Sequence, residues 1–224
     1  MGNIDGQPTK DFFVKMITRD ISIREAILDL VDNSIDGAKT ISDNDYSGLH
    51  VKISLSDNSF ILEDNCGGFS LDHAKNYAFR FGRPNEAKLT GGSIGRFGIG
   101  MKRALFKMGE VFEVESKTNN DHFQVNVNQT DWLSKKESVT RNNTEIEVED
   151  WSFDYVNITP VSKNLNNNGT FIKVTNLFSK ISSDFNSNEF LNDLENDLEN
   201  ILNFSIEKGL DISLNGEKIR SKNI

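Results

Sequence analysis

The sequence carries a carboxylate and an amide four residues apart, Asp29 and Asn33, within a segment of helical pattern. Residues at this spacing lie on one face of a helix, so the two side chains would reach the same site. A carboxylate can orient an attacking water and take its proton, and an amide oxygen is a suitable ligand for a magnesium ion bound to phosphates. The alternative is a solvated polar stripe opposite a buried face, and the pair alone does not decide between the two.

A second candidate is the run DNCGG at 64–68, which directly follows a predicted strand. The carboxylate of Asp64 could accept a hydrogen bond from an exocyclic amine such as that of adenine, and the glycines would let a base lie close to the backbone. The alternative is an ordinary turn in which Asp64 accepts from a backbone amide. Both interpretations fit the residues.

The third candidate is a glycine-rich run, GGSIGRFGIGMK at 91–102, that leads into a predicted helix. Converging backbone N–H groups and a helix N-terminus favour an anion such as phosphate. The run is not a Walker A loop, because Met101 stands where that loop has its lysine. It also differs from the dinucleotide fingerprint, because no strand leads directly into it. A loop that binds no ligand is the alternative.

The fourth candidate is Gly169–Thr170, which opens a predicted strand. Its hydroxyl could support a base or a bridging water. Taken alone, it is a plain turn that enters a strand.

Hydrophobic periodicity predicts the elements that carry these residues. The segment 21–38 has an amphipathic helical pattern whose apolar stripe includes the polar Ser34, and Gly37 is expected to end the helix. Further helices are predicted at 71–79, 101–108 and 188–207, the last with its apolar face formed by Leu191, Leu194, Leu198, Ile201 and Leu202. Alternating patterns predict strands, which lie at 49–56, 59–65, 111–118, 122–129, 144–151, 170–178 and 210–219.

Composition excludes several classes of protein. No run approaches the roughly 20 consecutive apolar residues of a membrane span, and the first residues lack the pattern of a secretory signal. A net charge of −9 makes the chain by itself a poor electrostatic match for nucleic acid. The single cysteine, Cys66, cannot form an internal disulfide, which is typical of a reducing compartment. We therefore expect a soluble cytoplasmic protein with no membrane association.

In order and spacing, the four candidates resemble the ATP-binding domain shared by gyrase B, the ninety-kilodalton heat-shock chaperone, sensor histidine kinases and MutL, the GHKL superfamily. DLVDNSIDGA resembles its Asn-bearing helix, EDNCGGF its Asp–Gly turn and GRFGIGMKRA its glycine-rich lid. NGTFIKVTNLF resembles its Gly-Thr strand, as found in the MutL and MORC branch. The resemblance covers roughly residues 10–208. It implies a Bergerat-type α/β fold (an α+β sandwich) in which helices cover one face of a mixed, mostly antiparallel sheet.

The resemblance also implies roles for individual residues. Asn33 takes the place of the magnesium ligand, Asp64 that of the adenine-reading carboxylate, and Thr170 that of a hydroxyl that supports the adenine site. Asp29 stands where the family has a catalytic glutamate, and its shorter side chain implies slow hydrolysis. The remaining implied ATP-binding positions belong to the turn and the lid; they are Gly68, Gly95, Arg96, Phe97, Gly98, Ile99, Gly100, Met101 and Lys102, of which Lys102 could meet a phosphate.

The implied function is magnesium-dependent binding of ATP and its hydrolysis to ADP and phosphate by a domain at 1–208, which would act as an ATP-gated conformational or dimerisation switch. Residues 209–224 would form a strand-turn segment that begins a following domain, and the nucleic-acid or protein client is not indicated. Two alternatives stay open. One is an ATP-binding switch that does not hydrolyse, because Asp29 is short. The other is the catalytic domain of a histidine kinase, which needs a phosphoacceptor histidine upstream, where only about twenty residues precede the Asn helix.

Overall fold

The computed structural model describes residues 6–82, 99–141, 143–158 and 164–221. Its helices are α1 (Lys10–Arg19), α2 (Ile23–Ile41), α3 (Leu71–His73), the π-helix η1 (Ala74–Ala78), α4 (Gly100–Met108), α5 (Gln129–Ser134), α6 (Ser179–Phe185), α7 (Asn188–Ile201) and α8 (Asn203–Glu207). Its strands are β1 (His50–Leu55), β2 (Ser59–Asp64), β3 (Gly109–Lys117), β4 (His122–Asn128), β5 (Lys136–Arg141), β6 (Thr144–Glu149), β7 (Tyr155–Asn157), β8 (Gly169–Leu177), β9 (Asp211–Leu214) and β10 (Glu217–Lys218).

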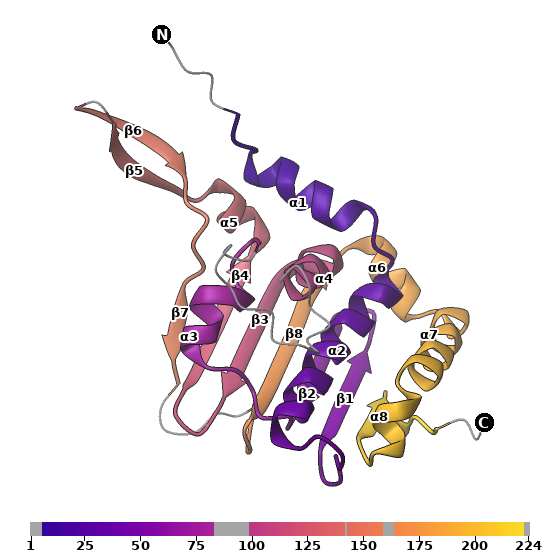
Figure 1. Ribbon diagram of the computed structural model, residues 1–224. Helices are drawn as coiled ribbons and strands as arrows, with labels where there is room; N and C mark the ends of the chain where they lie inside the picture. The colour runs from indigo at the N-terminus through magenta and orange to yellow at the C-terminus, as the bar shows by residue number, and fades with distance from the viewer. Residues whose placement is uncertain (1–5, 83–98, 142, 159–163, 222–224) are drawn as a thin grey trace.

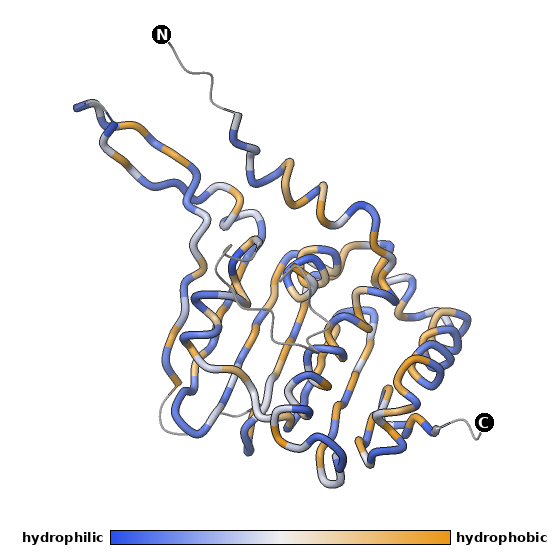
Figure 2. The backbone as a smooth tube through the Cα atoms, viewed as in Figure 1, coloured by the Kyte–Doolittle hydropathy of each residue, from blue (hydrophilic) through white to orange (hydrophobic). Residues whose placement is uncertain are grey.

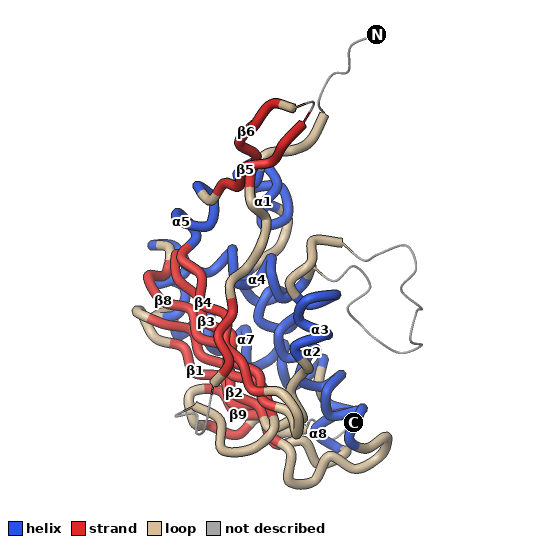
Figure 3. The backbone as a smooth tube through the Cα atoms, turned by 90° about the vertical axis from the view of Figure 1, so that its left-hand side faces the viewer, coloured by secondary structure: helices blue, strands red, loops and turns tan. Residues whose placement is uncertain are grey.

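Within these residues, eight strands form one sheet in the order β10-β9-β1-β2-β8-β3-β4-β7. Neighbouring strands are antiparallel except β1 and β9, which are parallel. Figures 1 and 3 show the sheet as one layer, with helices packed on one of its faces. The predicted fold class, a mostly antiparallel sheet covered by helices on one face, is therefore confirmed.

Two strands at the centre of the sheet turn alternate residues toward the helices, and Figure 2 shows the corresponding alternation of hydropathy. On β2, Phe60, Leu62 and Asp64 are all buried. Because side chains two apart on a strand point to the same face, Asp64 faces the helix layer as Phe60 and Leu62 do. A carboxylate thus ends an otherwise apolar row, beneath α2.

Helix α2 begins with a capping box. The backbone N–H of Glu25 donates to the Ser22 hydroxyl (3.2 Å), and the N–H of Ser22 donates to the Glu25 carboxylate (2.8 Å). The expectation that Gly37 ends this helix is wrong, since α2 continues to Ile41. A Cβ at Gly37 would come 2.5 Å from the carbonyl oxygen of Cys66. Glycine is therefore required here by close packing against the turn after β2.

The predicted helix at 188–207 is divided into α7 and α8 at Leu202. Leu194, Leu198 and Leu202 are buried as predicted, but Ile201 is 57% exposed and lies off that face.

Sequence patterns also missed α1, α5, α6, β5 and β7. Strands β5 and β6 form a separate hairpin that projects from the main body (Figure 1). No helix in the described residues is both long and apolar enough to cross a membrane.

Residues 211–218 form β9 and β10, which extend the main sheet beyond β1. The division into a domain at 1–208 and the beginning of another at 209–224 stays a prediction.

Candidate functional site

Asp64, at the end of β2, is the centre of a buried polar cluster. Its Oδ1 accepts hydrogen bonds from the backbone N–H groups of Cys66 (2.9 Å) and Thr170 (3.1 Å). Its Oδ2 accepts a hydrogen bond from the hydroxyl of Ser34 on α2 (2.7 Å). An ionised carboxylate offers about four acceptor positions, so Oδ2 retains capacity for a further donor. The side chain is 3% exposed, and three chain segments meet at it.

Burial raises the pKa of Asp64 above its ordinary value. The hydrogen bonds from Ser34, Cys66 and Thr170 favour the ionised form and limit that rise. The alternative considered from the sequence, a turn in which Asp64 accepts from a backbone amide, is thus present, because Oδ1 accepts from the N–H groups of Cys66 and Thr170. The same carboxylate keeps Oδ2 as an acceptor toward α2.

Glycines allow this close assembly. Gly68 has a φ of +64°, and a Cβ there would overlap the carbonyl oxygen of Lys117. A Cβ at Gly169 would overlap the carbonyl oxygen of Asp64. The predicted site residues Asp64, Gly68 and Thr170 are therefore brought together by backbone packing between β2, the following turn and the start of β8.

Asp29 lies on α2 and pairs with Arg103 of α4. Both Nε (2.9 Å) and Nη2 (2.6 Å) of Arg103 contact the same oxygen, Asp29 Oδ2. Among the described residues, Asp29 Oδ1 has no hydrogen-bond partner. The two side chains are 28% and 32% exposed, so the pair is open to solvent on one side. Asn33, one helical turn further on, is exposed.

Between these two lies a carboxylate that sequence reasoning did not single out. Burial, together with repulsion from Asp29 and Asp36, raises the pKa of Asp32 to about 6. Asp32 therefore titrates close to neutral pH, directly beside Asn33.

The N-terminus of α4 lies against Asp29. A Cβ at Gly100 would approach Asp29 Oδ2 to 3.3 Å, and Ile99 at the N-cap has no side-chain acceptor for the amides of the first turn. Met101, in the same turn, is partly buried against the core. The other lid positions predicted to bind ATP, Gly95, Arg96, Phe97 and Gly98, lie outside the described residues.

Lys102, also in the first turn of α4, is 1% exposed. Its ammonium donates to the carbonyl oxygen of Ala78 at the end of η1 (2.5 Å) and lies 5.6 Å from the centre of the Phe81 ring. Burial lowers the pKa of Lys102 to about 7. A direct contact with a phosphate would require this side chain to leave the carbonyl oxygen of Ala78.

Sequence reasoning missed Ser34 and Arg103 as parts of the site. Ser34 had a signal, because it is a polar residue within the apolar stripe of α2, and such a residue needs a buried partner. Arg103 had none, because 74 residues separate it from Asp29 and no periodicity links them.

Comparison with known families gives one match. The family model described as "Histidine kinase-, DNA gyrase B-, and HSP90-like ATPase" matches residues 21–166, which include Asp29, Asn33, Asp64 and α4. No curated protein matches the chain. The match spans more than half of the sequence and agrees with the strand order and helix layer described above. The chain belongs to the family of histidine kinase-, DNA gyrase B- and HSP90-like ATPases.

Proposed function

We propose that this domain binds ATP with magnesium and hydrolyses it slowly to ADP and phosphate. The observation that carries the proposal is the buried carboxylate of Asp64, which is held by three donors and keeps one oxygen able to accept another. This carboxylate is what a pocket for the adenine amino group needs. Membership in an ATPase family supports the same ligand.

Recognition of the base would depend on the direction of one hydrogen bond. The exocyclic amine of adenine donates to Asp64 Oδ2, whereas guanine would present its O6, a second acceptor. Leaving the carboxylate without that donor would cost on the order of 1–3 kcal/mol. Thr170 would help by holding Oδ1 through its backbone N–H. We therefore expect selectivity for adenine nucleotides.

The phosphates would lie toward Asn33 and the N-terminus of α4. Magnesium commonly takes few protein ligands beside phosphate oxygens, and the exposed amide of Asn33 fits that role. The ion, when bound, would neutralise the charge of the phosphates. Asp29 would use Oδ1 to orient the attacking water and take its proton, while Arg103 holds Oδ2 in place.

We also propose that ATP acts as a switch, in which closure around the phosphates favours association of two copies of the full-length protein. The contact of Lys102 with η1 supports this idea, because a phosphate that attracts Lys102 would release the end of η1. A MutL/MORC-like branch and a cytoplasmic location remain predictions from the sequence.

One observation favours a second candidate, an ATP-binding switch that does not hydrolyse. Arg103 occupies Asp29 Oδ2, and aspartate is one methylene shorter than the glutamate expected at this position. If Arg103 stays in place with ATP bound, Asp29 would have one oxygen left and a shorter reach to the water.

Calorimetric titration of the chain with ATP and with GTP, each with magnesium and with EDTA, tests the proposal. We expect ATP to bind more tightly than GTP by roughly 5- to 150-fold and to lose affinity in EDTA. Equal affinities for ATP and GTP would refute the role of Asp64. Phosphate release measured on the same samples separates the hydrolysing domain from the switch that only binds.

A further inference from the structure

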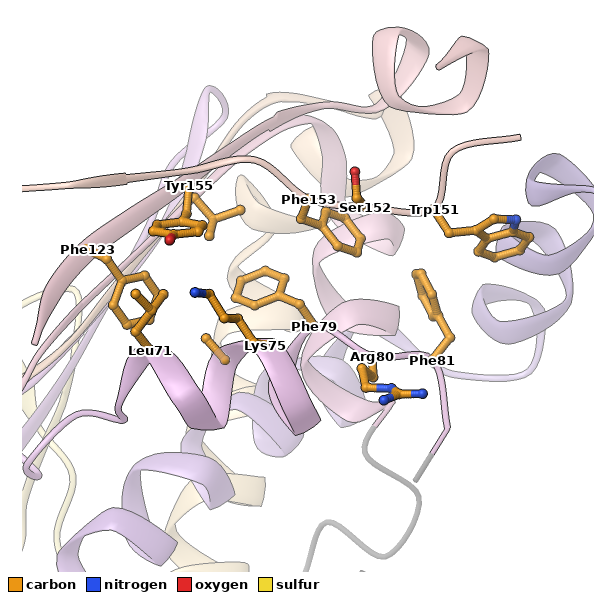
Figure 4. A pocket seen from close by; sticks show the side chains of 12 residues that line it. Leu71, Lys75, Phe79, Arg80, Phe81, Phe123, Trp151, Ser152, Phe153 and Tyr155 are labelled. Atoms are coloured by element: carbon orange, nitrogen blue, oxygen red, sulfur yellow. The ribbon is translucent and has the colours of Figure 1, made fainter. Parts of the chain in front are cut away.

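A cavity lies away from the candidate nucleotide site, between η1 and β4 and beneath the segment 151–155 (Figure 4). Its volume is about 440 Å³, within the range of roughly 300–1,000 Å³ that is typical of small-molecule sites. None of the residues assigned to the nucleotide site lines it. Figure 1 shows the reason, since α3 and η1 cover the β4 side of the sheet while α2 covers the β1 and β2 side.

Half of the residues that line this cavity are aromatic; they are Phe79, Phe81, Phe123, Trp151, Phe153 and Tyr155. Several of them are supported from behind by further rings. Phe153 stacks on Trp132 with ring centres 5.1 Å apart and an interplanar angle of 9°. Phe81 also contacts Trp132, at 5.8 Å. Walls packed in this way are preformed, so a planar ligand would enter with little rearrangement.

One cation is directed into the cavity. Figure 4 shows the Lys75 ammonium between the rings of Phe79, Phe123 and Tyr155, and its nitrogen lies 4.9 Å from the centre of the Tyr155 ring. Among the described residues, Lys75 forms no ion pair. Arg80 also lines the cavity, but its guanidinium points away from these rings. In a chain with a net charge of −9, a lysine without an acidic partner at an aromatic cavity favours an anionic ligand.

We propose that this cavity binds a small planar aromatic carboxylate, at a site separate from that of the nucleotide. The ring would lie among the aromatic walls, where offset and edge-to-face contacts are favourable. The carboxylate would accept a charge-assisted hydrogen bond from Lys75. A neutral aromatic molecule would fill the same walls without that bond, and an aliphatic carboxylate would lack the ring contacts. Both parts of the ligand are therefore needed.

Indole-3-acetate is a suitable probe, with indole-3-acetamide as its neutral match and acetate as its aliphatic match. Binding to the full chain is measured by ligand-observed NMR and by calorimetry. We expect indole-3-acetate to bind at least tenfold more tightly than either match. Lys75→Gln should weaken its binding about tenfold, because one charge-assisted hydrogen bond is lost. Lys180→Gln, at an exposed lysine of α6, is the matched control and should leave binding unchanged.

ATP and the probe should bind at the same time, since no residue is shared between the sites. Because Lys102 contacts the end of η1, saturating ATP with magnesium should shift the affinity of the probe to a finite limit without displacing it. The proposal is overturned if indole-3-acetate does not bind, if the amide binds equally well, or if Lys75→Gln behaves like Lys180→Gln. Full competition, in which rising ATP displaces the probe completely without reaching a limit, would also overturn it, because the cavity would then be part of the nucleotide site. A failure of ATP to bind would not affect these outcomes, so the two proposals fail independently.

Discussion

The two ends of the candidate nucleotide site are built in different ways. At the base end, Asp64 is buried and its hydrogen-bond donors come from Ser34 and two backbone amides. At the phosphate end, the ionisable groups Asp29 and Lys102 are held by contacts that a nucleotide would have to share or replace. The base end is fixed by the packing of backbone segments, whereas the phosphate end is fixed by side chains.

This difference has an energetic meaning. Moving Asp64 would require a helix, a turn and a strand to separate, because Gly37 and Gly169 let their backbones approach closely. Separating Asp29 from Arg103 would cost little, since partly exposed ion pairs are typically worth about 0–1 kcal/mol. A ligand would therefore find the base pocket already formed and would reorganise only the phosphate end. Such a division suits a switch that responds to the phosphates.

The strongest test of the phosphate end is Asp29→Asn. Asparagine keeps the size of the side chain and can still hold a water, but it cannot take the proton. General-base assistance is typically worth 10²–10⁴-fold, so steady-state phosphate release should fall by about that factor while ATP affinity stays nearly unchanged. Light scattering should then detect more of the ATP-bound dimer, if the switch works as proposed.

Asp36→Asn is the matched control on the same helix, because Asp36 pairs with Lys39 rather than with Arg103. Its turnover should match that of the parent. Asp29→Glu restores the side-chain length usual in the family and should raise the rate where the pocket admits one more methylene. If the parent shows no turnover and Asp29→Asn is indistinguishable from it, the switch that only binds becomes the better account.

Asp64→Asn tests the base end. The amide oxygen can still accept from Cys66 and Thr170, but the amide nitrogen would face the amine of adenine with a second donor. We expect ATP affinity to fall roughly 5- to 150-fold, with a smaller change for GTP. Ser34→Ala removes a neighbouring hydrogen bond but leaves the carboxylate, so its effect on ATP should be weaker. Equal losses for ATP and GTP would contradict base reading by Asp64.

Features of the two ends that depend on local sequence patterns could be predicted from the sequence. Strand alternation put Asp64 at the end of an apolar row, and helical spacing put Asp29 and Asn33 on one face. The prediction that Gly37 ends α2 was wrong because glycine is common at helix ends, whereas here it is needed for tertiary packing. The backbone of Cys66 approaches too closely to leave room for a Cβ. α1 was missed because it has only ten residues, and the exposed apolar residues Phe12 and Met16 obscure its short apolar stripe of Phe13, Val14 and Ile17.

The protonation of Lys102 on ATP binding provides a further test of the phosphate end. Its pKa of about 7 means that the side chain is mostly neutral at pH 8 in the free protein. Nearby phosphates would favour the charged form, so ATP binding at pH 8 should take up close to one proton. Calorimetry in two buffers of different ionisation enthalpy measures this uptake, which should vanish at pH 6 and in Lys102→Met. The same uptake in Lys102→Met would mean that another group is responsible.

The smallest effect is expected at Asp32, on α2 between the two ends. Its pKa is about 6 in the folded protein and near its ordinary value of 3.8 in the unfolded chain, so the folded state binds more protons between these values. Stability therefore falls as the pH rises from about 4 to about 6 and stays lowered above that range. Because asparagine does not ionise, Asp32→Asn should raise the free energy of unfolding at pH 7.5 by roughly 1–2 kcal/mol, a figure reduced for partial solvation. The gain should shrink toward zero near pH 4.

Urea denaturation of Asp32→Asn and of the exposed control Asp43→Asn, at both pH values, measures the difference. A gain that is the same at pH 4 and pH 7.5 would show that packing, rather than the buried charge on Asp32, is responsible.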